Sequence, residues 1–160
     1  MNKASSKNPN LTTNTRKFID GLTASNSAPI YTLKYEEARK VLDGLQSQIK
    51  IPKELDCDIQ DINVPMKSGG SVDVRIVKPL HSKEKLPVVV YFHGGGWVMG
   101  NKMTHDLLIR KIAIGANVAV FFVNYTPAPD AKYPVQLEQG YAVLDDVVKN
   151  ANKYNVDASR

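Results

Sequence analysis

The stretch that decides the fold runs Leu86-Pro-Val-Val-Val-Tyr-Phe-His-Gly-Gly-Gly-Trp97. Its first seven residues are apolar on both faces, which is typical of a central parallel strand covered by helices on each side. Three consecutive glycines then follow His93, and glycine loses more conformational entropy on folding than any other residue. We therefore expect these glycines to allow close approach of the backbone to a ligand, or a conformation that a Cβ atom forbids.

The residues after this stretch continue an alternation of strands and helices. Helical spacing of apolar residues predicts a helix over 102–114 and another over 134–153. An apolar, β-branched and aromatic run predicts a buried strand over 118–123. One face of the later helix carries Leu137, Tyr141, Leu144 and Val148. Strand, helix, strand and helix in succession indicate an α/β unit with a parallel sheet.

The residues before the stretch carry two different patterns. Strand-forming runs over 58–66 and 72–76, the second with clean alternation, flank a Lys-Ser-Gly-Gly turn and predict an antiparallel hairpin. Farther towards the N-terminus, apolar residues at helical spacing predict a helix over 34–49 and a shorter one within 11–24. Thr32 is a candidate N-cap for the longer helix.

Composition excludes several classes of protein. The chain has 160 residues, 42% of them hydrophobic, which suffices for a packed core of one domain. Its net charge of +5 comes from basic residues scattered among acidic ones, so we expect no nucleic-acid partner. The single cysteine, Cys57, excludes an internal disulfide and a Cys-rich zinc module. Without a signal peptide or a membrane-spanning stretch, a cytoplasmic location is expected.

Spacing separates three uses of a glycine cluster. The dinucleotide-binding fingerprint G-x-G-x-x-G is excluded, because the glycine after Gly94 and Gly96 is Gly100, one residue too far. A phosphate-binding loop is excluded because Asn101 occupies the position of its lysine. The remaining interpretation is an oxyanion hole, in which backbone N–H groups of an H-G-G-G loop stabilise a tetrahedral intermediate.

The chain resembles the hormone-sensitive-lipase-like group of α/β-hydrolases, which are mostly carboxylesterases. The resemblance covers residues 29–160 and rests on four stretches: Tyr91-Phe-His-Gly-Gly-Gly-Trp97, Thr104-His-Asp106, Val123-Asn-Tyr-Thr-Pro-Ala-Pro-Asp130 and Tyr133-Pro-Val-Gln-Leu-Glu138. The third is similar to the family's Asp-Tyr-Arg-Leu-Ala-Pro-Glu segment. Asn124, where the family often has Asp, and Thr126-Pro127, in place of Arg-Leu, depart from it.

The resemblance implies roles for the glycine loop. Gly94, Gly95 and Gly96 match the oxyanion-hole glycines of the family, with Gly95 the firmest of the three. His93 matches the family histidine that holds this loop by hydrogen bonding, and it is not the catalytic base. No metal or organic cofactor is implied.

The resemblance also implies a fold and a substrate pocket. The expected fold is the N-terminal portion of an α/β-hydrolase fold, with an antiparallel hairpin leading into a parallel sheet flanked by helices. Residues 1–50 would form a tail and cap helices, and residues 51–160 the first half of the core. Trp97 would line the substrate pocket or serve as a core aromatic residue, and Tyr31 and Tyr35 are candidates for the substrate-facing side of the cap.

The catalytic triad of this family is missing from the sequence. No serine lies in G-x-S-x-G, and His81, His93 and His105 all precede the position that the family's base occupies. Residues 153–160 resemble the segment that enters the family's next strand, which leads to the nucleophile. We therefore expect the 160-residue chain alone to be inactive, with an exposed apolar sheet edge over 87–92. The remaining half of the domain would come from a second chain or a missing segment.

The expected function is hydrolysis of a small carboxylic ester through a serine acyl-enzyme. This chain would supply the cap and the oxyanion hole. Two alternatives remain open. One is a non-catalytic ligand-binding protein of the same fold, as in the plant gibberellin receptors, and the other is an inactive truncated fragment.

Overall fold

A computed structural model describes residues 8–25 and 27–160, and the chain divides into two units between residues 38 and 39. The first unit contains helix α1 (Thr13–Ala24) and a short 3₁₀ turn, η1 (Ile30–Thr32). The Thr12 hydroxyl caps α1 by accepting a hydrogen bond from the Thr15 N–H at 3.2 Å. The predicted helix within 11–24 is thereby confirmed.

Helix α2 (Tyr35–Ser47) begins in the first unit and continues into the second. The prediction of a helix over 34–49 is confirmed, but the prediction of Thr32 as its N-cap is wrong. The Thr32 hydroxyl donates to the Pro29 carbonyl at 2.7 Å at the end of η1, three residues before α2 starts. The hydroxyl is therefore used locally by the preceding turn.

The hairpin of the second unit follows a 3₁₀ turn, η2 (Lys53–Leu55). Strands β1 (Cys57–Pro65) and β2 (Ser71–Pro79) pair antiparallel along their whole length, as predicted. The turn between them is closed by the Met66 N–H, which donates to the Gly70 carbonyl at 3.0 Å.

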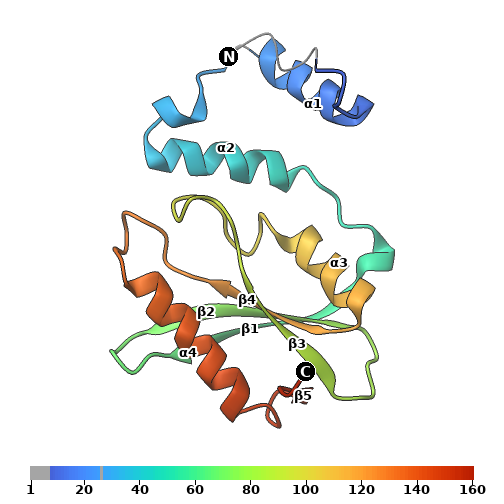
Figure 1. The fold of residues 1–160 in the computed structure, drawn as a ribbon, viewed down its shortest axis with the longest axis vertical. Coiled ribbons are helices and arrows are strands. Elements are labelled where there is room, and N and C mark those ends of the chain that lie inside the picture. Colours follow the sequence, from blue (N-terminus) through green and yellow to red (C-terminus); the bar gives the residue numbers. More distant parts are fainter. Residues whose placement is uncertain (1–7, 26) are drawn as a thin grey trace. The chain divides into compact units, whose positions relative to one another are not determined.

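Three further strands complete one sheet in the order β1-β2-β4-β3-β5 (Figure 1). They are β3 (Leu86–Phe92), β4 (Ala119–Asn124) and β5 (Val156–Asp157). Strand β3 runs parallel to both β4 and β5, whereas β2 runs antiparallel to β4. This antiparallel hairpin leading into parallel strands confirms the predicted arrangement of the sheet.

Helices α3 (Asp106–Ala116) and α4 (Val135–Lys149) cover opposite faces of the sheet (Figure 1). Successive residues of β4 alternate between the two cores, so that Phe121 belongs to the α4 side and Phe122 to the α3 side. Both rings are fully buried. Burial of one such side chain contributes about 1.5–3 kcal/mol to the stability of the fold. Strand β4 supplies residues to both cores and is therefore central to the fold.

Both core helices differ from the sequence-based expectation at their ends. Helix α3 begins at residue 106 rather than 102, because the Asn101 side chain accepts the N–H groups of Met103 and Thr104 in a turn. Helix α4 ends at residue 149 rather than 153, in the turn that leads to β5.

The apolar face predicted for α4 is exposed. Its members are Leu137, Tyr141, Leu144 and Val148. The side of α4 that meets the sheet instead carries Gln136, Gln139, Gly140, Val143 and Val147. The two buried amides are satisfied by the loop after β4: Gln139 accepts the Thr126 N–H at 2.8 Å, and Gln136 donates to the Thr126 carbonyl at 3.0 Å.

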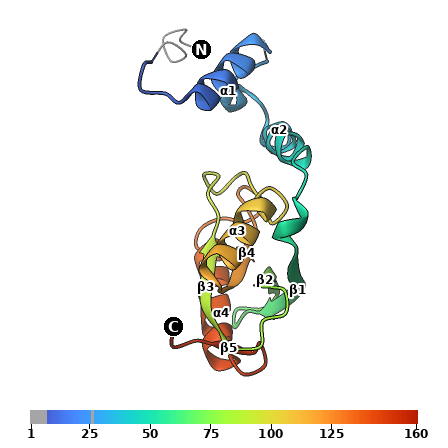
Figure 2. The same cartoon turned by 90° about the vertical axis from the view of Figure 1, so that its right-hand side faces the viewer.

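Strand β5 covers only the beginning of β3. It pairs with Leu86 and Pro87, and the Val88 N–H donates to the Arg160 carbonyl at 2.9 Å. Both views show the C-terminus beside the start of β3 (Figures 1 and 2). The sheet edge expected over 87–92 therefore begins only at residue 89, and within the described residues no strand pairs with that side of residues 89–92.

Candidate active site

The loop that leaves β3 has an unusual backbone. Gly95, Gly96 and Trp97 take positive φ angles of 130°, 62° and 58°, one after another. The Gly95 carbonyl accepts hydrogen bonds from the N–H groups of Val98 at 3.2 Å and Met99 at 3.0 Å, which closes a tight turn. A Cβ atom on Gly95 would lie 1.9 Å from the Met99 carbonyl oxygen, so only glycine fits this position.

The N–H groups of Gly94, Gly95 and Gly96 find no acceptor in the described part of the chain. Gly94 and Gly95 line a cavity of about 440 Å³, and its other walls come from α2, from α3 and from Thr104 and His105, which precede α3. Successive N–H groups beside a cavity are suited to binding a negatively charged oxygen.

His93 lies beneath this loop and is only 5% exposed. Its ring stacks on Tyr125 with a centroid distance of 4.2 Å and on Phe122 at 5.2 Å. Nδ1 lies 2.8 Å from the Gly94 carbonyl oxygen and donates to it, while the Tyr125 hydroxyl donates to the His93 carbonyl at 2.8 Å. Burial lowers the pKa of the imidazole, so the ring stays neutral near pH 7.

Gly100 closes the loop against the same histidine. Its φ is 94°, and a Cβ atom there would lie 2.8 Å from Nδ1 of His93. Both ends of the loop therefore contact one buried ring, which anchors the turn between them.

Arg39 on α2 ties the loop to a second loop. Its Nε donates to the Val98 carbonyl at 2.8 Å and its Nη2 to the Ala128 carbonyl at 2.9 Å, while Nη1 pairs with Asp130 at 2.8 Å. The Ala128 N–H in turn donates to the Trp97 carbonyl at 2.7 Å. Sequence reasoning missed Arg39, since nothing in its neighbourhood distinguishes it from other helical surface arginines.

Asn124 supports the segment that follows the loop. Its side-chain oxygen accepts the Lys102 N–H at 3.0 Å, and its amide donates to Asp73 at 2.8 Å. The Lys102 ammonium lies 2.8 Å from the same Asp73 carboxylate. An amide at residue 124 suits this arrangement, because a carboxylate would face that of Asp73. The departure from the family pattern thus has a local physical reason.

A chain of charges fixes the start of α3 to the hairpin. The Arg75 guanidinium lies between Asp61, at 2.8 Å, and Asp106, at 3.4 Å, and Arg110 pairs with Asp106 at 2.8 Å. Hydrogen bonding from Arg75, more than the contact with Lys102, lowers the pKa of Asp61 to about 2. These carboxylates are therefore engaged in ion pairs of the scaffold.

The remaining predicted site residues lie in different surroundings. Trp97 is 62% exposed, so it is not a core aromatic residue within the described chain. Tyr31 is exposed and Tyr35 is partly buried, both in the first unit. Their roles towards a substrate stay predictions.

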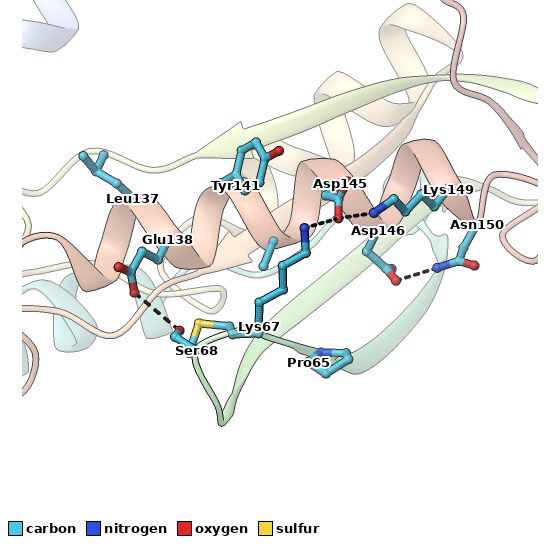
Figure 3. Close-up of a pocket in the computed structure, with 12 residues that line it drawn as sticks. Pro65, Lys67, Ser68, Leu137, Glu138, Tyr141, Asp145, Asp146, Lys149 and Asn150 are labelled. Atoms are coloured by element: carbon cyan, nitrogen blue, oxygen red, sulfur yellow. Dashed lines mark hydrogen bonds and ion pairs between the residues drawn. The ribbon is translucent and has the colours of Figure 1, made fainter.

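A larger cavity lies away from the glycine loop, between the hairpin turn and α4. Its volume is about 600 Å³. Charged side chains on its rim pair with one another: Lys67 and Lys149 both reach Asp145, and Ser68 donates to Glu138 (Figure 3). None of the predicted site residues lines it.

No group of three or more His, Cys, Asp or Glu side chains in the described residues is arranged to hold a metal ion. Across residues 8–25 and 27–160, no helix has both the length and the hydrophobicity that crossing a membrane requires.

Comparison with known proteins places this geometry in a family. Residues 89–160 match the model of the alpha/beta hydrolase fold. A putative alpha/beta hydrolase of Acanthamoeba polyphaga mimivirus is 37% identical over 142 residues, covering 89% of this chain and 39% of the relative. The carboxylesterase NlhH of Mycobacterium tuberculosis is 38% identical over 115 residues, covering 71% of this chain and 36% of the relative.

Solved structures of esterases show the same similarity. A thermostable esterase from Pseudomonas putida superimposes with a TM-score of 0.87 at 33% identity, covering 93% of this chain and 46% of that protein. The predicted fold, the N-terminal portion of an α/β-hydrolase fold, and the resemblance to the hormone-sensitive-lipase-like carboxylesterases are thereby confirmed. The chain spans less than half the length of these relatives.

Proposed function

We propose that this chain is part of a carboxylic ester hydrolase and that Gly94, Gly95 and Gly96 provide its oxyanion hole. The observation that carries the proposal is the set of three unused N–H groups in a loop held by His93 and Arg39. Similar proteins named carboxylesterase and esterase support the reaction class.

The loop would act during acyl transfer. Attack on an ester carbonyl places negative charge on its oxygen, and fixed N–H donors stabilise that oxyanion more than the neutral carbonyl. Loss of one such donor typically costs about 3–4 kcal/mol of transition-state stabilisation. Collapse of the intermediate breaks the ester C–O bond, releases the alcohol and leaves an acyl-enzyme. Water then attacks the acyl-enzyme and releases the acid.

The nucleophile, the carboxylate and the base would come from outside these 160 residues, because no serine here lies in G-x-S-x-G. The unpaired edge of β3 over residues 89–92 and the exposed apolar face of α4 are the surfaces on which the rest of the domain would dock. The chain by itself would then have no esterase activity.

The N-terminal residues would shape access to the site. We propose that residues 1–50 form the tail and cap, that Tyr31 and Tyr35 face the substrate, and that Trp97 lines the pocket. A cytoplasmic location is proposed on the sequence evidence alone.

Hydrolysis of p-nitrophenyl acetate and butyrate tests the proposal. We expect no turnover by residues 1–160 alone, and turnover once the missing half is supplied. Gly95→Pro, which removes an N–H donor, should then abolish most of kcat/KM, whereas Gly69→Ala in the hairpin turn should not. If the 160-residue chain alone hydrolysed these esters, and a serine-directed phosphonate blocked that activity, the nucleophile would lie within this chain. That result would contradict the proposal.

A second candidate is a ligand-binding protein of the same fold without turnover, because the residues that would separate the two functions would lie outside these 160 residues. In that case the completed protein would bind esters at Gly94 and Gly95 and release them unchanged. Detection of free p-nitrophenol from the completed protein separates the two functions.

A further inference from the structure

The cavity beside the glycine loop differs in charge from other cavities of the described residues. Four others each include at least one carboxylate, among them Asp145, Glu84, Asp106 and Asp130. The cavity at Gly94 and Gly95 includes none. An anion entering this cavity therefore meets no like charge on its walls.

The same cavity carries a cation. Lys111 on α3 lines it, and no carboxylate of the described residues pairs with the Lys111 ammonium. His105 lines it too, with Nδ1 turned to the Thr104 hydroxyl at 2.9 Å. Together with the unused N–H groups of Gly94 and Gly95, the cavity offers hydrogen-bond donors and a positive charge.

The remaining walls carry three leucines beside the polar side chains of Gln46 and Thr104. Leu42 comes from α2, and Leu107 and Leu108 come from α3. The volume of about 440 Å³ lies within the range of sites for small molecules. A short hydrocarbon chain would contact these leucines while its polar ends reach the donors.

We propose that this cavity binds esters whose chain ends in a carboxylate, with the ester carbonyl at Gly94 and Gly95 and the carboxylate at Lys111. This rests on the proposed function and specifies its substrate class as half-esters of short dicarboxylic acids. The apolar walls set the length of the chain between the two polar ends.

Two probes of similar size test the proposal: monomethyl succinate, which has one carboxylate, and dimethyl succinate, which has none. Dissociation constants are measured on the full 160-residue chain from the amide NMR shifts of Gly94 and Gly95. We expect monomethyl succinate to bind about twofold to fivefold more tightly, since Lys111 is exposed and an exposed ion pair contributes modestly. Lys111→Met should remove the preference, and Lys111→Arg should keep it. Lys83→Met, at an exposed loop position, is the matched control and should leave it intact.

The possible outcomes separate the two levels of the proposal. The carboxylate site is overturned if both probes bind equally at Gly94 and Gly95, or if the preference for monomethyl succinate survives Lys111→Met. In either case the loop would still bind esters. If neither probe shifts these two amides, the carboxylate site and the proposed oxyanion role fail together.

Discussion

Two turns of this protein are rich in glycine, and they use it for different reasons. In the hairpin turn, Gly69 and Gly70 have φ angles of 95° and 74°, but a Cβ atom on either would meet no atom closer than 3.7 Å. In the loop after β3, a Cβ atom on Gly95 would overlap a carbonyl oxygen at 1.9 Å. The hairpin needs only the backbone angle, whereas the loop needs the angle and the empty space.

The two turns also differ in what holds them. Two backbone hydrogen bonds close the hairpin turn locally, one from the Met66 N–H to the Gly70 carbonyl and one from the Gly69 N–H to the Met66 carbonyl. The β3 loop is held by His93 below it and by Arg39 from α2. A strained turn persists only where its surroundings determine it, and this is the situation expected of a functional loop.

The largest expected effect is the contrast between Gly95→Ala and Gly69→Ala. Gly95→Ala should lower the free energy of unfolding by about 3 kcal/mol, through strain at positive φ and overlap with Met99. Gly69→Ala should cost about 1 kcal/mol, through strain alone. Urea unfolding of both variants measures the difference. Equal losses would show that the space around Gly95 does not matter.

Removal of Arg39 should loosen the β3 loop more than it destabilises the sheet. Arg39→Ala should cost about 1–2 kcal/mol and should raise the mobility of Trp97, the only tryptophan, in fluorescence anisotropy. Asp130→Asn removes only the more exposed partner and should cost less than about 1 kcal/mol. Unchanged anisotropy in Arg39→Ala would show that the loop is held without this contact.

Asn124→Asp tests the support behind the loop. A second carboxylate beside Asp73 should destabilise the protein by about 1 kcal/mol near pH 7, partly offset by Lys102. Adding Asp73→Asn to this variant should recover stability, because one negative charge is removed. Thermal unfolding of the single and double variants measures the coupling between residues 73 and 124. If the effects of the two substitutions simply added, the two side chains would not interact.

Acid should weaken the loop through His93. Burial lowers the pKa of His93 in the folded protein below its ordinary value near 6.5, so the unfolded chain binds the proton more readily. Stability is therefore full above pH 6.5 and is lost as the pH falls below it. We expect His93→Asn to flatten this part of the pH profile of unfolding, whereas His81→Asn, at an exposed turn position, should not. An unchanged profile in His93→Asn would assign the loss to another group.

Sequence patterns predicted the elements of the core well. Strand β3 has the bounds expected from its apolar run, and the hairpin pairs as its alternation indicates. The patterns did not predict buried polar side chains whose hydrogen-bond partners lie on another part of the fold. Gln136 and Gln139 are buried on α4 because they bond the loop at Thr126, a partner that no local period reveals. The apolar residues of α4 mark its exposed face, which in the proposed function is a docking surface for the rest of the domain.

The amino-acid sequence by itself determined the class of fold and the place of the candidate site, because apolar periodicity and consecutive glycines are local properties of the chain. Only the tertiary structure decided that Arg39 holds the loop, that Asn124 faces Asp73, and that the cavity at Gly94 carries Lys111 without a carboxylate. These contacts join residues far apart in the sequence, and their energies depend on distance and burial that arise only when the chain packs.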